Sequence, residues 1–154
     1  MNNLWGDFSE IETLSTPQKI LNEQASYLNS ATKNQVLATL VKSDPVPVFM
    51  EERNSDFKFD FILTSPRIRG YKYKVFKLFH DVQIYPLYIK VEESIVEEIG
   101  ESLIEITRND SNDNDFCEYE ILDEETFLNV LRMILSSKTI MRVITSLISL
   151  ADSM

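Results

Sequence analysis

Two glutamates in the last third of the chain come closest, by type and spacing, to a reactive pair. Glu118 and Glu120 lie in the segment FCEYEIL, whose composition and alternation indicate a β-strand. Alternate side chains of a strand share one face, so the two carboxylates would be near enough to shift each other's pKa. An acid/base enzyme that uses this pair is therefore one alternative function. In a region this acidic, however, such pairs of carboxylates are expected from composition alone. No other residue of the sequence indicates that this pair is catalytic.

The chain has one histidine, His80, and one cysteine, Cys117. A single histidine excludes any site that needs two. Cys117 follows Phe116 in the same predicted strand and has no flanking signature, which is typical of a buried, unreactive thiol. Neither a nucleophile elbow nor a phosphate-binding loop is present, and the three glycines are isolated from one another. We expect no catalytic residue and no cofactor, and the sequence favours a non-enzymatic role.

The stretch DSNDND resembles the beginning of a calcium-binding loop. Counted from Asp110, Asp115 takes the position that requires glycine and Ile121 the position of the bidentate glutamate. Counted from Asp113, Glu118 takes the glycine position. Neither register gives the turn that a calcium loop needs, so we expect a polar hairpin loop and no bound metal.

A basic strip occupies residues 67–90. Residues 66–90 have a net charge of +5, with Asp81 as the only acid. The basic side chains are Arg67, Arg69, Lys72, Lys74, Lys77 and Lys90. Aromatic residues interleaved with basic ones can stack bases and neutralise phosphates, so a nucleic-acid-binding protein is a second alternative. Strand alternation, however, places Tyr71 and Tyr73 in the core and Lys72 and Lys74 on the opposite face. The favoured interpretation is therefore that the lysines mark the solvated face of a sheet, and not a nucleic-acid-binding surface.

The acidic residues are concentrated elsewhere. Residues 92–125 contain 14 acids and one base, Arg108, within a chain whose net charge is -10. Oppositely charged regions make a dipole that can steer a charged partner. We therefore expect another protein as the partner, a basic one for the acidic region, and no nucleic acid.

Apolar side chains also gather in two irregular segments. Residues 1–15 are predicted to be an N-terminal arm whose apolar residues pack on the body, with binding to a partner through Trp5 and Phe8 as the alternative. The long connection 44–56 contains Pro45 and Pro47, which cannot continue a strand. Its Phe49 and Met50 are further candidates for contact with a partner, and the connection is either a flap or a loop tucked onto the core.

Periodicity and capping signals define the remaining elements. The expected strands are 36–42, 57–64, 71–80, 84–92, 102–107 and 116–122. The expected helices are 17–32, 93–100, and a helical region from 124 onward with a break at Ser136–Ser137. The side-chain parity changes at Val75–Phe76, which predicts either a β-bulge there or a strand that is covered on both faces. Gly100 is expected to end the short helix in the left-handed conformation.

This order of elements predicts an α+β fold with two layers. A mainly antiparallel sheet of about five to six strands would be covered on one face by the N-terminal helix and the C-terminal helices. With 154 residues and ordinary globular composition, residues 16–154 are expected to form a single domain.

The C-terminal helix is the candidate surface for self-association. Its apolar stripe consists of Ile140, Val143, Ile144 and Leu147. Small hydroxyl side chains, rather than charges, occupy much of the space between them, which suggests contact on more than one side of the helix. Burial of this stripe within one molecule is the favoured interpretation, and a homodimer that forms through this helix is the alternative.

Charged and polar residues interrupt the longest apolar region, 127–151, and the first 15 residues lack the pattern of a secretory signal. We expect a cytosolic protein without a membrane span. In length, acidity and strand–helix alternation the chain resembles bacterial type III secretion chaperones in architecture class only, without a shared motif. The sequence favours a small acidic, non-catalytic protein-binding module of a chaperone, immunity or adaptor kind.

Overall fold

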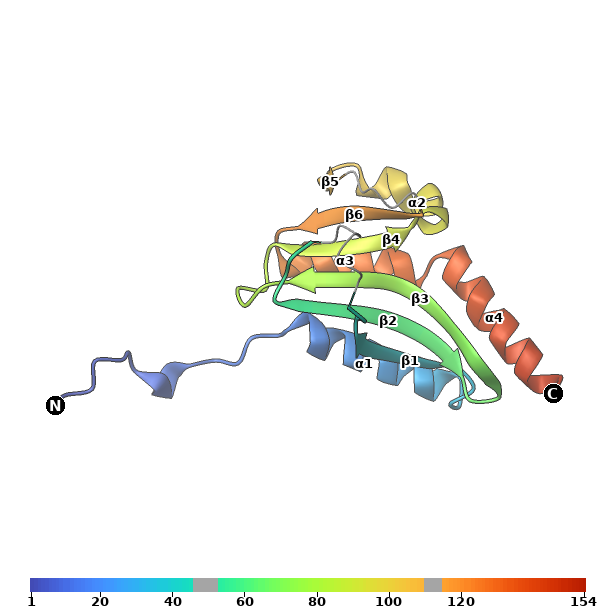
Figure 1. Cartoon of the computed structure of the whole chain (residues 1–154), viewed down its shortest axis with the longest axis horizontal. Helices are drawn as coiled ribbons and strands as arrows, with labels where there is room; N and C mark the ends of the chain where they lie inside the picture. Colours follow the sequence, from blue (N-terminus) through green and yellow to red (C-terminus); the bar gives the residue numbers. More distant parts are fainter. Residues whose placement is uncertain (46–52, 110–114) are drawn as a thin grey trace.

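The structure is a computed structural model that describes residues 1–45, 53–109 and 115–154. Within these residues six strands form one antiparallel sheet (Figure 1). The strands are β1 (Leu37–Lys42), β2 (Phe57–Ser65), β3 (Ile68–His80), β4 (Leu87–Glu92), β5 (Arg108–Asn109) and β6 (Phe116–Ile121). The helices are α1 (Pro17–Ala31), α2 (Glu93–Ile99), α3 (Glu124–Leu135) and α4 (Lys138–Asp152), with 3-10 turns η1 (Phe8–Glu10) and η2 (Gly100–Leu103).

The sheet and the helices form two layers, as the sequence predicts. The strand order is β1-β2-β3-β4-β6-β5, so β1 and β5 are the outermost strands. In Figure 1, α1 and α3 lie behind the sheet and α4 lies beside its right end. We call the face that these helices cover the helix face, and the opposite one the outer face. The fold is α+β.

The helices begin where the sequence supplies capping side chains. The Thr16 hydroxyl accepts a hydrogen bond from the Lys19 N–H at 3.2 Å, and Pro17 occupies the first helical position of α1. Asp123 caps α3 in the same way, accepting from the Thr126 N–H at 2.8 Å. The predicted break between the last two helices is confirmed, because α3 ends at Leu135 and Ser137 caps α4.

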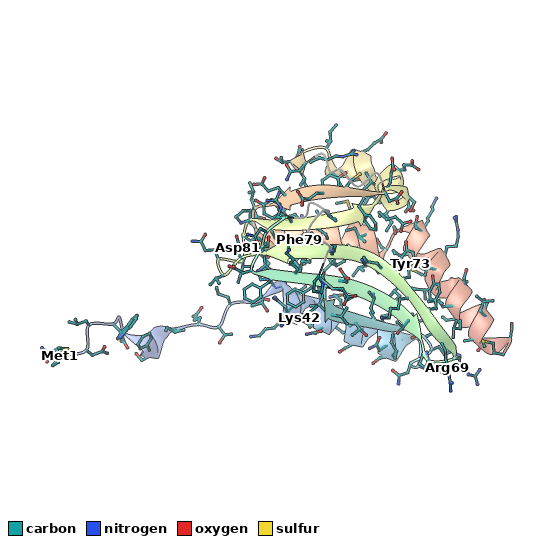
Figure 2. All side chains as sticks on the ribbon, in the orientation of Figure 1. Met1, Lys42, Arg69, Tyr73, Phe79 and Asp81 are labelled. Atoms are coloured by element: carbon teal, nitrogen blue, oxygen red, sulfur yellow. The ribbon has the colours of Figure 1, made fainter. Side chains whose placement is uncertain are left out.

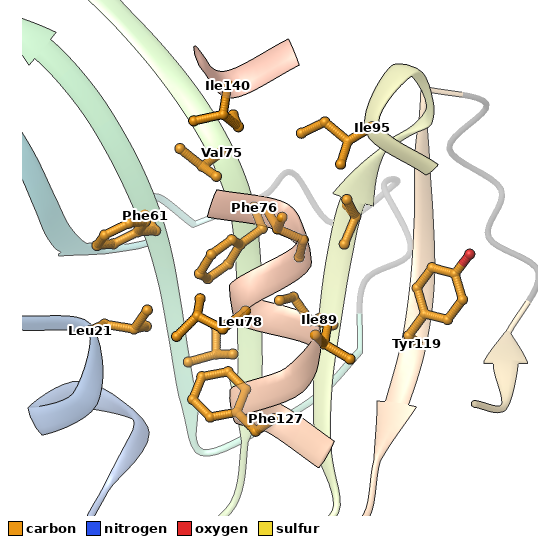
Figure 3. Close-up of a cluster of buried hydrophobic side chains, with 14 of the residues drawn as sticks. Leu21, Phe61, Val75, Phe76, Leu78, Ile89, Ile95, Tyr119, Phe127 and Ile140 are labelled. Atoms are coloured by element: carbon orange, nitrogen blue, oxygen red, sulfur yellow. The ribbon is translucent and has the colours of Figure 1, made fainter. Parts of the chain in front are cut away.

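The core lies between the helix face and the helices. Alternate residues of β3 and β4 point into it, and Leu78 and Ile89 are completely buried. Figure 3 shows Leu21 of α1 and Phe127 of α3 beside Leu78, and Ile140 of α4 beside Val75 of β3, all within one cluster. Each fully buried Leu, Ile or Phe side chain contributes roughly 1.5–3 kcal/mol to folding, so this layer accounts for much of the stability.

The predicted β-bulge is confirmed, and it shapes one end of the molecule. Phe61 pairs with Phe76 but the next residue, Ile62, pairs with Lys74, so Val75 is the extra residue. Beyond the bulge the first half of β3 pairs only with β2, because β4 reaches no further than Phe76. This part of the β2–β3 hairpin extends past β4 and lies beside α4 (Figure 1).

Two local predictions around Gly100 are wrong. Residues 102–107 are not a strand: η2 covers Gly100–Leu103, and the described strand that pairs with β6 begins at Arg108. Gly100 itself is right-handed, at φ -57° and ψ -33°, so the chain continues in a helical path after α2. The reason is a second periodicity, because Ile95, Ile99 and Leu103 recur at intervals of four and the helical path buries Leu103.

The N-terminal arm does not pack on the body, contrary to the sequence expectation. Figure 1 shows it running away from the start of α1. Trp5 is 78% exposed, and Leu4, Ile11 and Leu14 are exposed as well. Trp5 and Phe8 contact each other, with ring centroids 6.5 Å apart.

Candidate functional site

A hollow of about 280 Å³ lies where the extended β2–β3 hairpin meets α4. We call it the hairpin groove. Two segments distant in the sequence line it, the start of β3 and one side of α4. The lining residues are Ile68, Tyr71, Arg142, Val143, Ser146, Leu147 and Leu150.

The hairpin is attached to α4 by Arg67. Its guanidinium donates a hydrogen bond to the carbonyl oxygen of Ala151 at 3.0 Å. This carbonyl belongs to the last turn of α4, where the helix dipole favours a cation. Gly70 follows in β3 with φ +79°, a conformation that residues with side chains rarely adopt. Figure 2 shows Arg69 at this end of the hairpin, near the C-terminal end of α4, and Phe79 and Asp81 at the other end of β3.

The groove is apolar at its base and open at its edges. Leu147 is buried at the base, and Ile68 and Val143 are half-buried beside it. Tyr71 is 39% exposed and Leu150 56% exposed, so both present apolar surface to solvent. The sequence prediction that Tyr71 lies in the core is therefore wrong, because the hairpin extends beyond the layer that would cover it.

The charged residues at the groove are mainly basic. Arg142 is the charged side chain among the lining residues and is exposed. Arg67, Arg69 and Lys72 are exposed on the same hairpin. Lys74 instead reaches the outer face, where its ammonium lies 3.5 Å from the Asp60 carboxylate. The groove is thus an apolar hollow with basic surroundings in a chain of net charge -10.

A second hollow, of about 440 Å³, lies between α2, η2 and β6. We call it the α2 groove. Its charged lining residues are Glu93, Glu97 and Arg108, so acids predominate. Ile104, exposed at 84%, lies at its edge.

The predicted carboxylate pair lies on the outer face, and one member is already bound. Glu118, which is 6% exposed, accepts hydrogen bonds from Arg53 Nε and Nη2 at 3.2 and 2.9 Å. Asn109 donates another at 3.0 Å, and the Arg53 guanidinium stacks on Tyr88 with its carbon 3.5 Å from the ring centroid. Burial alone would raise the pKa of Glu118, but the donors and positive charge of Arg53, with Asn109, lower it below the ordinary value. Held ionised by these partners, Glu118 acts as a structural carboxylate.

The neighbouring lysines of the basic strip surround an aromatic ring. Phe79 is completely buried on the outer face, and the ammonium groups of Lys77 and Lys90 each lie 5.7 Å from its ring centroid. Glu120 is half-buried on the same face, where it pairs with Tyr88 across the sheet. The bases in the second half of the strip therefore contact the protein itself.

His80 and Cys117 are both buried, at different places in the fold. His80 Nδ1 donates to the Asp81 carbonyl oxygen and Nε2 accepts from the Gln18 amide, both at 2.8 Å. The imidazole also stacks on Phe57, with centroids 5.0 Å apart. The Cys117 thiol is on the helix face, where its Sγ accepts a hydrogen bond from Arg108 Nη2 at 3.0 Å. These contacts use both ring nitrogens of His80.

Other residues singled out in the sequence have different outcomes. Ile140 and Leu147 are buried in the core, whereas Val143 and Ile144 are half-buried on α4. Self-association through this stripe stays a prediction, with two of its four members already covered within one molecule. Phe49, Met50 and the calcium-like stretch from Asp110 to Asp113 lie outside the described residues. Arg53 is the site residue that sequence analysis missed.

In the described parts of the chain, no three or more His, Cys, Asp or Glu side chains are grouped so that they could hold a metal ion. No single helix there has the length and apolar character to cross a membrane, while α3 and α4 meet those criteria only as a pair, bent by 50°. Comparisons of the chain with protein-family models, with curated proteins and with solved structures found no match.

Proposed function

We propose that the chain is a non-catalytic protein-binding module that takes an acidic segment with apolar side chains in the hairpin groove. The observation that carries the proposal is the composition of this groove, an apolar hollow whose charged lining residue is Arg142. Exposed aromatic, aliphatic and arginine side chains around a hollow are the usual anchors of protein interfaces. Acidic residues of a bound segment would face Arg142 and the hairpin arginines, while its apolar side chains would cover Leu150 and Tyr71.

The acidic region 92–125 remains a candidate for a basic partner. Its α2 groove is lined by Glu93 and Glu97, which would attract basic rather than acidic segments. The cytosolic location expected from the sequence is part of the same proposal.

The proposal is tested with two labelled peptides in a fluorescence anisotropy titration. One peptide alternates leucine and phenylalanine with glutamate, and the other carries lysine at each glutamate position. We expect the acidic peptide to bind and Leu150→Ser to weaken it about tenfold, since the lost apolar contact corresponds to roughly 1.4 kcal/mol. Leu122→Ser is the matched control, because Leu122 is also an exposed leucine but lies outside the groove.

Equal affinity for the acidic and basic peptides, or an unchanged affinity in Leu150→Ser, would contradict the proposal. The nucleic-acid alternative predicts a different result in the same instrument. A labelled single-stranded oligonucleotide would bind with strong salt dependence and be released by substitution of Arg69, Lys72 and Lys74.

A further inference from the structure

The N-terminal arm has the chemistry that the hairpin groove is suited to bind. Its exposed apolar side chains include Leu4, Trp5, Phe8, Ile11 and Leu14. Acidic residues, among them Asp7 and Glu12, are interleaved with them. Asp7 accepts hydrogen bonds from the Ser9 N–H at 2.9 Å and hydroxyl at 2.7 Å, which forms the turn that brings Trp5 and Phe8 together.

We propose that the arm of a second copy of this chain occupies the hairpin groove, so that the protein self-associates by exchange of its arms. The inference rests on the proposed function, because it names one acidic apolar segment that the groove would take. Docking would cover the arm's exposed apolar side chains and Leu150, and would place Glu12 near Arg142. Reciprocal exchange between two copies fills both grooves and gives a closed two-fold dimer.

The position of α1 is the reason for choosing a second copy over the molecule's own arm. Gln35, just after α1, donates a hydrogen bond to Asp152 at the end of α4 at 3.0 Å. The C-terminal end of α1 is therefore beside the groove, and its N-terminal end is a helix length away, roughly 22 Å for 15 residues. Glu12, which the proposal pairs with Arg142, is five residues before Pro17 and can reach only about 17 Å from it. In Figure 1 the arm leaves the body at the end opposite the groove.

Charge is the reason for choosing the hairpin groove over the α2 groove. The arm carries Asp7 and Glu12, and the α2 groove presents Glu93 and Glu97 to any segment that enters it. Like charges at an interface disfavour binding, whereas Arg142 in the hairpin groove offers the opposite charge.

The test uses Trp5, which is the only tryptophan of the chain. Its emission is recorded over a dilution series of the full chain, and sedimentation velocity gives the mass at each concentration. We expect a blue shift and a doubled mass on concentration, because the indole passes from solvent into the groove of a second copy. Both changes should move to at least tenfold higher concentration in Arg142→Glu and in Glu12→Lys.

The charge-swap variant, Arg142→Glu combined with Glu12→Lys, should restore association, since the pair is re-formed with reversed signs. Arg132→Glu on α3 is the control for a change of net charge, because Arg132 is exposed and is not a lining residue of the groove. A monomer with a blue-shifted Trp5 at every concentration would mean that the arm binds its own body. A solvent-exposed Trp5 at every concentration, or a dimer that Arg142→Glu leaves intact, would likewise overturn the inference.

A peptide measurement separates this inference from the proposed function. The full chain with Trp5→Ser and Phe8→Ser is titrated with the labelled acidic peptide used above. If the arm competes for the groove, this variant binds the peptide more tightly than the unaltered chain does. Peptide binding without any arm docking would leave the proposed function standing and reject the arm exchange, and loss of both would reject both.

Discussion

Arg53 joins parts of the fold that are distant in the sequence. It precedes β2 by a few residues, yet its guanidinium binds Glu118 on β6 and stacks on Tyr88 of β4. Two strands, β3 and β4, separate β2 from β6 in the sheet, so the chain before β2 reaches across the outer face. One ion pair thus fixes the position of the end of the β1–β2 connection.

Replacing Arg53 by methionine should lower the free energy of unfolding by about 1–3 kcal/mol, because the buried Glu118 carboxylate loses its strongest donors. Chemical denaturation followed by circular dichroism measures the change. Arg69→Met is the control, since Arg69 is an exposed arginine on the same sheet. Equal effects of the two substitutions would show that the ion pair contributes nothing specific.

Glu118 also predicts how stability depends on pH. Its pKa is lowered in the folded protein relative to an ordinary glutamate, so its contribution is fully present above about pH 4.5 and is lost as the pH falls through the folded value. Glu118→Gln removes this dependence. The difference in unfolding free energy between the unaltered protein and Glu118→Gln should therefore shrink on acidification below pH 4.5. A difference that stays constant with pH would contradict this prediction.

The sequence predicted the face on which Glu118 and Glu120 lie, because alternation along a strand fixes it. It gave no indication of Arg53 as a partner. Arg53 and Glu118 are 65 positions apart, and Arg53 lies in an irregular segment without a period. A contact of this kind depends on the tertiary path of the chain, which local patterns do not encode.

Among the elements, α2 has a role in starting α4. The Glu98 carboxylate accepts hydrogen bonds from the backbone N–H groups of Lys138 and Thr139, at 2.6 and 3.0 Å. These donors belong to the first turn of α4, where backbone N–H groups have no partner within the helix. The hydrogen bond from the Lys138 N–H, together with those from Thr139, lowers the pKa of Glu98. Glu98 of α2, which precedes Lys138 by 40 residues, thus helps to cap α4, the helix that lines the hairpin groove.

Glu98→Ala should let the first turn of α4 open more often, because two of its N–H groups lose their acceptors. Amide hydrogen exchange measured by NMR should become several-fold faster at Lys138 and Thr139 and stay unchanged in the middle of α3. Glu97→Ala is the control, since Glu97 is an adjacent exposed acid on α2. Unchanged exchange at both amides in Glu98→Ala would show that Ser137 alone suffices as the cap.

Most helices and strands could be predicted because the apolar residues of each recur with a single period, either that of a helix or that of a strand. The bulge at Val75 was also predictable, since a change of side-chain parity within one strand requires an extra residue. Residues 102–107 failed because two periods coincide there and burial of Leu103 decided between them. Two of the hydroxyls between the apolar residues of α4 have partners within the helix: Thr145 and Ser149 donate to the carbonyls of Met141 and Thr145, each at 2.8 Å.

At the scale of the whole molecule, one core lies beneath one sheet, while the arm is separate from both. The buried residues from α1, the sheet, α3 and α4 form a single cluster. Trp5 is outside it and exposed. In dilute solution the folding of the body and the conformation of the arm should therefore be independent of each other.

Urea unfolding of dilute protein should show one cooperative transition by far-ultraviolet circular dichroism, because a single cluster unfolds as a unit. Trp5 emission should change little across that transition, since the indole is already in solvent. Tyrosine emission, which includes the buried Tyr119, serves as the internal control. Two separate transitions, or Trp5 emission that follows the loss of secondary structure, would contradict this description.

The two outermost strands limit how this sheet can grow. Within the described residues β5 spans Arg108–Asn109, and along β1 the Asn29 side chain of α1 already accepts a hydrogen bond from the Ala38 N–H at 2.9 Å. A short edge and an occupied edge donor are both poor templates for a further strand from another molecule. Growth of the sheet by further strands is thereby disfavoured at these two edges, and the association proposed above relies on side chains instead.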